Sequence, residues 1–254
     1  MAIVAAASQG LGRAIAEALA AEGARLAICS RSEKNINTTA AAIRDKHKAD
    51  VFAQTLDVVD EKGVKRFVEV VAQKYGRIDV CVTNAGGPPA KGFLATSTEE
   101  WRRAFEMNLL STIHFAREVI PHMQRARWGR LIAITSVAVK QPIPDLVYSN
   151  VVRTGVVALM RSLSNEFGRD GLTFNNIAPG YTATERLKEL AHHRAHAAGL
   201  ETRAIIDKWA EGTAAGRIAQ PAEVADAVVF LASERAAMIT GQTLLVDGGS
   251  YKGL

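Results

Sequence analysis

The feature that most constrains the fold of this chain is a regular alternation of short apolar runs with longer amphipathic stretches. The runs are rich in Val, Ile, Leu and Ala, and the stretches between them carry apolar residues at helical spacing. Gly23 and Gly76 each follow such a stretch, and glycine there supplies the left-handed end of a helix. The predicted strands are 2–6, 25–29, 51–56, 79–82, 131–135, 172–177 and 243–246.

Apolar strands that alternate with helices predict parallel strands joined by right-handed crossovers, with helices on both faces of the sheet. We therefore predict an α/β protein: a single-domain Rossmann fold over 1–254, with a doubly wound, seven-stranded parallel sheet. Only the segment 184–211 departs from this alternation of strands and helices. This segment is polar and helix-forming, and a long excursion of that kind is typical of a lid or substrate loop.

Composition restricts the class of protein. The 254 residues are 48% hydrophobic and 22% charged, as in a soluble globular domain. No apolar run approaches the ~18 residues of a membrane span, and the first residues lack the basic region of a signal peptide. The net charge is +5, but the basic residues are scattered, so we expect neither nucleic acid nor a membrane as a partner. Cys29 and Cys81 each end an apolar run, and buried, reduced cysteines predict a cytoplasmic location.

Glycines and polar residues gather where the predicted strands end. The first strand leads through Gly10 and Gly12 into a helix, whose N-terminal N–H groups can bind a pyrophosphate. Asp57 ends the third strand, where a carboxylate can meet an adenine amino group. Ligands bind at this edge of open α/β sheets, so we predict a dinucleotide site there. Its predicted residues are Ser8, Gln9, Gly10, Leu11, Gly12, Ser30, Arg31, Asp57, Val58, Asn84, Ala85, Gly86, Pro179, Gly180, Thr182 and Thr184.

Several motifs make the chain resemble the short-chain dehydrogenase/reductase superfamily, most closely its 3-oxoacyl-(acyl-carrier-protein) reductase-like members. They are Asn84-Ala85-Gly86, Asn108-Leu109, Gly129-Arg130, Ala178-Pro179-Gly180 and Val246-Asp247-Gly248-Gly249. The resemblance implies hydride transfer between a nicotinamide and a small or acyl-chain carbonyl substrate, in a homotetramer. One departure is Ala6, which stands where the family has the first glycine of its turn.

The end of the second predicted strand indicates which nicotinamide cofactor binds. NAD-preferring members of such folds place an acid there for the ribose hydroxyls. This chain has Ser30 and Arg31 instead, a hydroxyl and a guanidinium suited to a 2′-phosphate. We therefore predict NADP(H) rather than NAD(H).

The resemblance also implies a catalytic centre, and here that centre is altered. Asn108 and Ser136 match the family's Asn and Ser. The family then uses Tyr-x-x-x-Lys, in which Tyr moves the proton and Lys binds the nicotinamide ribose and lowers the Tyr pKa. Here Tyr148 is followed four residues later by Val152, so no such pair exists.

Spacing supports another alignment. Ser149 follows Ser136 by thirteen residues, the family interval, and places Arg153 on the Lys position, whereas Tyr148 is one residue early. An arginine stays charged and can hydrogen-bond ribose hydroxyls, but a serine is a far poorer proton donor than a phenol. One helical step is a rotation of ~100°, so Tyr148 reaches the site only if the helix starts late or unwinds. Two proton routes remain open: Tyr148, or Ser149 with a water molecule.

The sequence thus predicts an NADP(H)-dependent oxidoreductase that interconverts a ketone and an alcohol. The alternative is a nucleotide-binding homologue that has lost turnover, since the Tyr–Lys pair is absent. His192, His193 and His196 cluster in 184–211 with no Cys or acid to complete a ligand set, so we predict solvated side chains and no metal.

Overall fold

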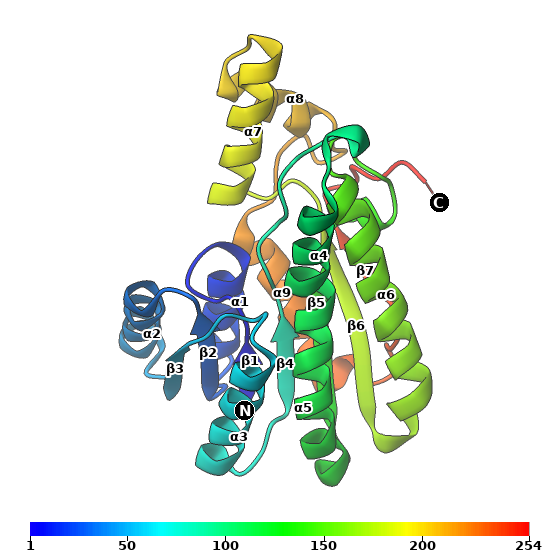
Figure 1. The fold of residues 1–254 in the computed structure, drawn as a ribbon. Helices are drawn as coiled ribbons and strands as arrows, with labels where there is room; N and C mark the ends of the chain where they lie inside the picture. The colour runs from blue at the N-terminus through cyan, green and yellow to red at the C-terminus, as the bar shows by residue number, and fades with distance from the viewer. Residues whose placement is uncertain (254) are drawn as a thin grey trace.

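A computed structural model describes residues 1–253 and confirms the predicted architecture. Within those residues, seven parallel strands form one sheet in the order β3-β2-β1-β4-β5-β6-β7 (Figure 1). The chain adds strands outward from β1 to β3 and then returns to add β4 on the other side of β1. The order of strand addition therefore reverses between β1 and β4. The strands are β1 (Ala2–Val4), β2 (Leu26–Ser30), β3 (Val51–Thr55), β4 (Val80–Thr83), β5 (Gly129–Ile134), β6 (Leu172–Pro179) and β7 (Thr243–Val246).

Helices cover both faces of the sheet, as is usual for parallel strands (Figure 1). One apolar core lies between the sheet and α1, α2 and α9, and a second lies between the sheet and α3, α5 and α6. The helices are α1 (Gly10–Ala21), α2 (Glu33–His47), α3 (Glu61–Tyr75), α4 (Thr98–Phe105), α5 (Ser111–Ala126), α6 (Val147–Phe167), α7 (Glu185–Ala198), α8 (Thr202–Glu211) and α9 (Pro221–Ala232). No helix in residues 1–253 is long and apolar enough to span a membrane.

Two strands end two residues away from the predicted position, and the carboxyl ends of the others differ by at most one residue. β1 ends at Val4 because the backbone turns at Ala6, whose φ of 50° is incompatible with an extended strand. β6 continues to Pro179, since it remains paired with β7 up to the register Pro179–Val246. Both differences bring backbone groups of the site to the carboxyl edge of the sheet.

The segment 184–211 forms α7 and α8, which rise above the carboxyl edge of the sheet (Figure 1). These two helices have an apolar core of their own, centred on Leu187, Ile205 and Trp209. The ring of Tyr181 stacks on Trp209 with centroids 4.7 Å apart. The helix pair is therefore a small packed unit, which we call the lid.

Candidate active site

A cavity of about 950 Å³ lies at the carboxyl edge of the sheet, beneath the lid. Its walls come from the turns after β1, β2, β3 and β4, from the ends of β5 and β6, from α6 and from the first turn of α7. Most of the residues predicted for the cofactor and for catalysis line this one cavity, namely Ser8, Gln9, Gly10, Leu11, Ser30, Arg31, Asp57, Val58, Asn84, Ala85, Gly86, Ser136, Ser149, Arg153, Pro179, Gly180, Thr182 and Thr184.

The turn after β1 brings backbone close to any ligand at the N-terminus of α1. Ala6 and Gly10 both have left-handed backbone, with φ of 50° and 56°. Gly12 does not line the cavity; a Cβ there would collide with the Ala6 carbonyl oxygen, so its role is close packing of α1 on the turn. Asn84 Nδ2 donates to that same oxygen at 3.4 Å and joins the end of β4 to the turn.

Arg31 lies at the end of β2 on the cavity wall, and its side chain is exposed. It forms no hydrogen bond or ion pair with any other residue in 1–253. Beside it, Ser32 Oγ caps α2 by accepting from Asn35 N at 3.3 Å, and Ser30 Oγ donates to the Ser32 carbonyl oxygen at 3.3 Å. The guanidinium of Arg31 is therefore available to an anion.

Arg153 is a buried residue that lines the cavity, and α6 directs it toward the end of β5. Its Nη1 donates to the carbonyl oxygens of Ile134 and Thr135 at 2.9 and 3.1 Å. Its Nε donates to Ser149 Oγ at 3.1 Å. Burial, with a smaller effect of the Arg186 cation, lowers the pKa of Arg153 to about 10, so the group stays charged at neutral pH. No carboxylate in residues 1–253 pairs with it.

Ser136 and Ser149 both face the cavity from its inner end. Ser136 Oγ accepts from Ala138 N at 3.1 Å, and Ser149 Oγ accepts from Arg153, so each hydroxyl keeps its own proton to donate. Arg153 links Ser149 to the carbonyl oxygens of Ile134 and Thr135, and Ser136 follows Thr135 directly in the chain. These two hydroxyls and this guanidinium can polarise a carbonyl oxygen and stabilise negative charge on it.

Asn108 lies behind this group rather than in the cavity. It belongs to a single turn of π-helix, Glu106–Leu110, between α4 and α5. Its Nδ2 donates to the Ala104 carbonyl oxygen at 3.3 Å, while Oδ1 is buried without a partner in residues 1–253. A very small second cavity separates it from Arg153.

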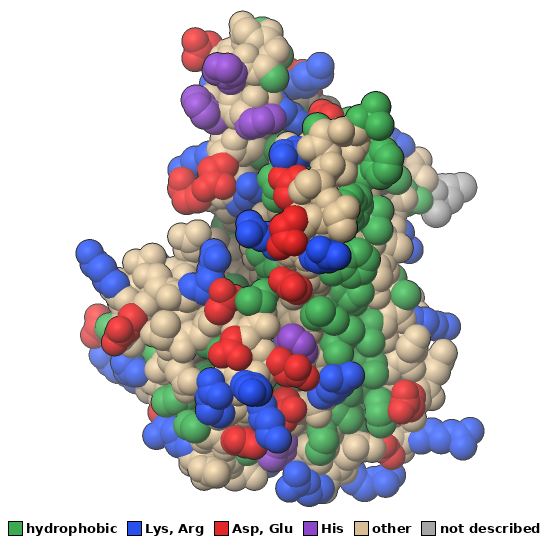
Figure 2. Space-filling model, viewed as in Figure 1, with side chains coloured by type: hydrophobic (Ala, Val, Ile, Leu, Met, Phe, Trp, Pro, Cys, Tyr) green, Lys and Arg blue, Asp and Glu red, His purple; other side chains and the backbone are tan. Residues whose placement is uncertain are grey.

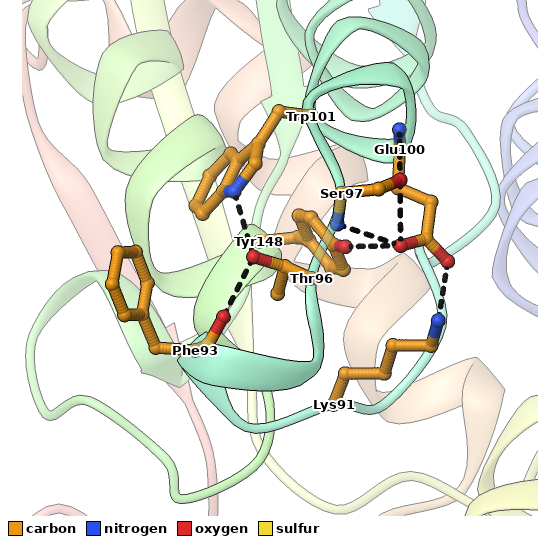
Figure 3. A network of polar contacts seen from close by, with 7 residues as sticks. All are labelled: Lys91, Phe93, Thr96, Ser97, Glu100, Trp101 and Tyr148. Carbon is orange, nitrogen blue, oxygen red and sulfur yellow. Dashed lines mark hydrogen bonds and ion pairs between the residues drawn. The ribbon is translucent and has the colours of Figure 1, made fainter.

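The structure does not bring Tyr148 into the cavity, which corrects its inclusion among the catalytic residues. α6 begins at Val147, so the helix is already formed at Tyr148 and turns it away from Ser149. The Tyr148 hydroxyl donates to Glu100 Oε2 at 2.9 Å, and its fully buried ring packs edge-on against Trp101 (Figure 3). Burial, and then the Glu100 carboxylate, raise the pKa of the phenol, the opposite of what proton transfer near neutral pH needs.

The outer part of the cavity contains residues that the sequence analysis missed. Apolar residues from five segments of the chain form this wall: Pro88, Pro89, Met107, Ile143, Leu146, Tyr181, Leu187 and Leu190. The available signal was the Pro88-Pro89 pair, which only Gly87 separates from the Asn84-Ala85-Gly86 motif.

Two lid arginines hold the lid over this wall. Arg186 Nη2 donates to the Pro88 carbonyl oxygen at 2.6 Å, and Arg194 Nη2 donates to that of Pro144 at 3.0 Å. The lid histidines at 192, 193 and 196 are exposed on α7 (Figure 2). Residues 1–253 contain no group of three or more His, Cys, Asp or Glu side chains placed to hold a metal ion.

Comparison with known proteins places the chain in a family. A family model described as enoyl-(acyl carrier protein) reductase matches residues 5–251. The chain belongs to the short-chain dehydrogenase/reductase superfamily and is an oxidoreductase. It is 34% identical to the 3-oxoacyl-[acyl-carrier-protein] reductases FabG of Haemophilus influenzae, over 99% of this chain and 98% of that protein, and of Escherichia coli, over 99% and 97%.

Solved structures of reductases and oxidoreductases also match this chain. L-sorbose reductase from Gluconobacter frateurii, in complex with NADPH and L-sorbose, matches with a TM-score of 0.94 and 29% identity, over 100% of this chain and 97% of that one. An NADPH-bound short-chain oxidoreductase from Pseudomonas aeruginosa, described as containing an atypical catalytic center, matches with a TM-score of 0.91 and 29% identity, over 100% and 97%. The fold therefore occurs in NADPH-bound proteins, and one of them has an unusual centre.

Proposed function

We propose that this protein is an NADPH-dependent reductase that converts a ketone to an alcohol, with a 3-oxoacyl compound as the first substrate class to test. The observation that carries the proposal is that Ser136 lines the same cavity as the hydrogen-bonded pair Ser149 and Arg153, together with most of the predicted cofactor residues. The apolar outer wall favours a substrate with a hydrocarbon chain or ring.

The residues present fit a nicotinamide dinucleotide. Backbone at the start of α1 is open to a pyrophosphate, because Gly12 lets the helix pack directly on the Ala6 turn. Arg31 would bind a 2′-phosphate, and the buried cation of Arg153 would bind ribose hydroxyls. When bound, the cofactor supplies the hydride.

The chain's own residues would handle the carbonyl oxygen. Ser136 and Ser149 would each donate a hydrogen bond to it, and the Arg153 cation would stabilise the negative charge that develops there. Since Tyr148 bonds to Glu100, the proton would come from Ser149, with replacement from a water molecule in the cavity. A serine route is slower than a phenol route at neutral pH, so we expect modest turnover.

The test is loss of the reduced-nicotinamide absorbance when the protein is mixed with NADPH and a panel of ketones that includes 3-oxoacyl thioesters. Turnover that falls at least about 100-fold in Ser149→Ala and no more than about tenfold in Tyr148→Phe supports the serine route. A large loss in Tyr148→Phe alone, with NADPH binding intact, contradicts it.

A second candidate function is nucleotide binding without turnover. The observation that favours it is the Tyr148 phenol, which is turned from the cavity and bonded to a carboxylate. Tight NADPH binding together with no substrate-dependent absorbance change across the panel would support this candidate over the reductase.

We also propose a homotetramer. Exposed apolar residues lie on α6 and on the π-turn beside it, with Val151 at 48% and Leu110 at 39% exposure. A green band of hydrophobic side chains runs over the face that α5 and α6 occupy (Figure 2). Light scattering should give a mass near four chains, and a mass of one chain contradicts the proposal.

A further inference from the structure

The first turn of α6 carries Ser149 into the cavity, and it lacks a side-chain cap at its first residue. The residue before the helix, Leu146, offers no side-chain cap. Asp145 before it has left-handed backbone with φ of 61°, which an L-residue adopts at a cost. Most helices are fixed at this end by a polar N-cap side chain. The local support of this turn is the Asn150 side chain, which accepts from Ile143 N at 3.1 Å and donates to the Ile143 carbonyl oxygen at 3.0 Å. Contacts from elsewhere in the fold add to it.

Glu100 provides such a contact and is the centre of a polar network at the cavity wall (Figure 3). Its Oε1 accepts from Lys91 Nζ at 2.5 Å, and its Oε2 accepts from the Tyr148 hydroxyl at 2.9 Å. Oε2 also accepts from the backbone N and the hydroxyl of Ser97, both at 3.0 Å, in a capping box that starts α4. Bonds from Lys91, and then from Tyr148 and Ser97, lower the pKa of Glu100 to about 2, so it is a carboxylate at any working pH.

The same network reaches the chain just before α6. Lys91 pairs with Leu146 in an isolated parallel bridge, so the residue that holds Glu100 also holds the backbone at the helix start. The Tyr148 ring is fully buried against Trp101, with ring centroids 4.7 Å apart. Lys91, Glu100 and Tyr148 thus join the loop after β4, the start of α4 and the start of α6. We call these three residues the clamp.

We propose that the clamp is a positioning device: by holding Tyr148 on Glu100 it sets the rotation of the first turn of α6 and directs Ser149 into the cavity. Consecutive residues of a helix differ in direction by ~100°, so fixing one side chain fixes the other. Tyr148 is then a positioning residue in place of a proton donor. The inference rests on the proposed function only in taking Ser149 as the group that acts on substrate.

A matched control exists elsewhere in the molecule. The Tyr75 hydroxyl donates to Asp50 Oδ1 at 3.1 Å, which is another tyrosine–carboxylate bond, and neither residue lines the cavity. Tyr75→Phe removes the same kind of bond as Tyr148→Phe without touching α6. Differences between these two variants report on the clamp rather than on the loss of a phenol.

The first experiment does not depend on turnover. Amide hydrogen exchange at 150–153, the first hydrogen-bonded amides of α6, is measured in the full-length protein. Tyr148→Phe and Glu100→Gln should each speed exchange there at least about fivefold, and Tyr75→Phe should not, because local opening follows the loss of local contacts. Unchanged exchange in both clamp variants overturns the proposal, whether or not the protein proves to be a reductase.

The second experiment asks whether the clamp acts through Ser149. Tyr148→Phe should lower kcat about tenfold with KM for NADPH unchanged, since small displacements of a reacting group are costly. In a Ser149→Ala background, under single-turnover conditions, the same change should cost less than about twofold, because the two residues act as one unit. An equal loss in both backgrounds means a general structural effect and overturns the proposal. Absence of turnover in the unmodified protein refutes the proposed function instead. The amide hydrogen exchange experiment then decides by itself whether the clamp positions the first turn of α6.

Discussion

The predicted cofactor residues at the carboxyl edge of the sheet, which we call the cofactor edge, line the same cavity as the first turn of α6. The two regions differ in how closely their sequences match the family motifs. The cofactor edge departs at the start of its first turn, where Ala6 replaces a family glycine and keeps a left-handed backbone with φ of 50°. The first turn of α6 has lost both members of the Tyr–Lys pair. Dinucleotide binding relies largely on backbone groups and a helix terminus, which many side chains permit. Proton transfer relies on one group in one direction, so a single substitution changes it.

Replacement of Arg153 should have the largest effect, because this residue belongs to both regions. Arg153→Ala should abolish turnover, by at least about 100-fold, through loss of the charge that stabilises a developing oxyanion. It should also weaken NADPH binding in a fluorescence titration. Arg117→Ala, an exposed arginine on α5, is the control. If Arg153→Ala kept both turnover and affinity, α6 would not form the active site.

Rebuilding the family pair should sharpen the contrast between the two regions. Ser149→Tyr places a phenol in the cavity, and Arg153→Lys supplies the family cation beside it. The double variant should turn over faster than the product of the two single effects predicts, since residues of one catalytic unit are not additive. Rates are compared with the same ketone panel. A double variant that only multiplies the single effects would mean that the departure lies elsewhere in the site.

A smaller effect is expected at the cofactor edge. Arg31→Ala should weaken NADPH by about 1–3 kcal/mol, the scale of a charge-assisted hydrogen bond, and should leave NADH almost unchanged. Calorimetric titration of both cofactors gives the comparison directly. Equal losses for NADPH and NADH would remove the argument that Arg31 reads the 2′-phosphate.

The smallest effect is expected for Ala6, the residue of the cofactor edge that replaces a family glycine. Ala6→Gly should stabilise the fold by about 0.5–1 kcal/mol in urea unfolding, because glycine adopts a positive φ without the penalty of a Cβ. Ala7→Gly is a matched control, since Ala7 is buried and its φ is not positive, so it should destabilise. Loss of stability in Ala6→Gly would show that the methyl group makes contacts worth more than the strain.

The predicted fold followed from local patterns, and the reason is physical. Strand and helix periodicity, and glycine at the end of α3 with φ of 73°, are properties of neighbouring residues. The crossover rule then leaves only a few sheet topologies for such an alternation, of which the doubly wound sheet is one. Because ligands bind where parallel strands end, the residues after β1, β2, β4 and β6 could be expected to line one cavity without any knowledge of side-chain contacts.

The sequence by itself therefore determined the fold class, the edge of the sheet at which a ligand binds and the positions of Ser149 and Arg153 in the family pattern. Only the tertiary structure decided which way Tyr148 points. That choice depends on Glu100, which lies 48 residues earlier in the chain, and on Lys91, which meets Leu146 across two loops. Local spacing carries no information about such pairs, because they form only when the helices and loops of the folded domain pack together.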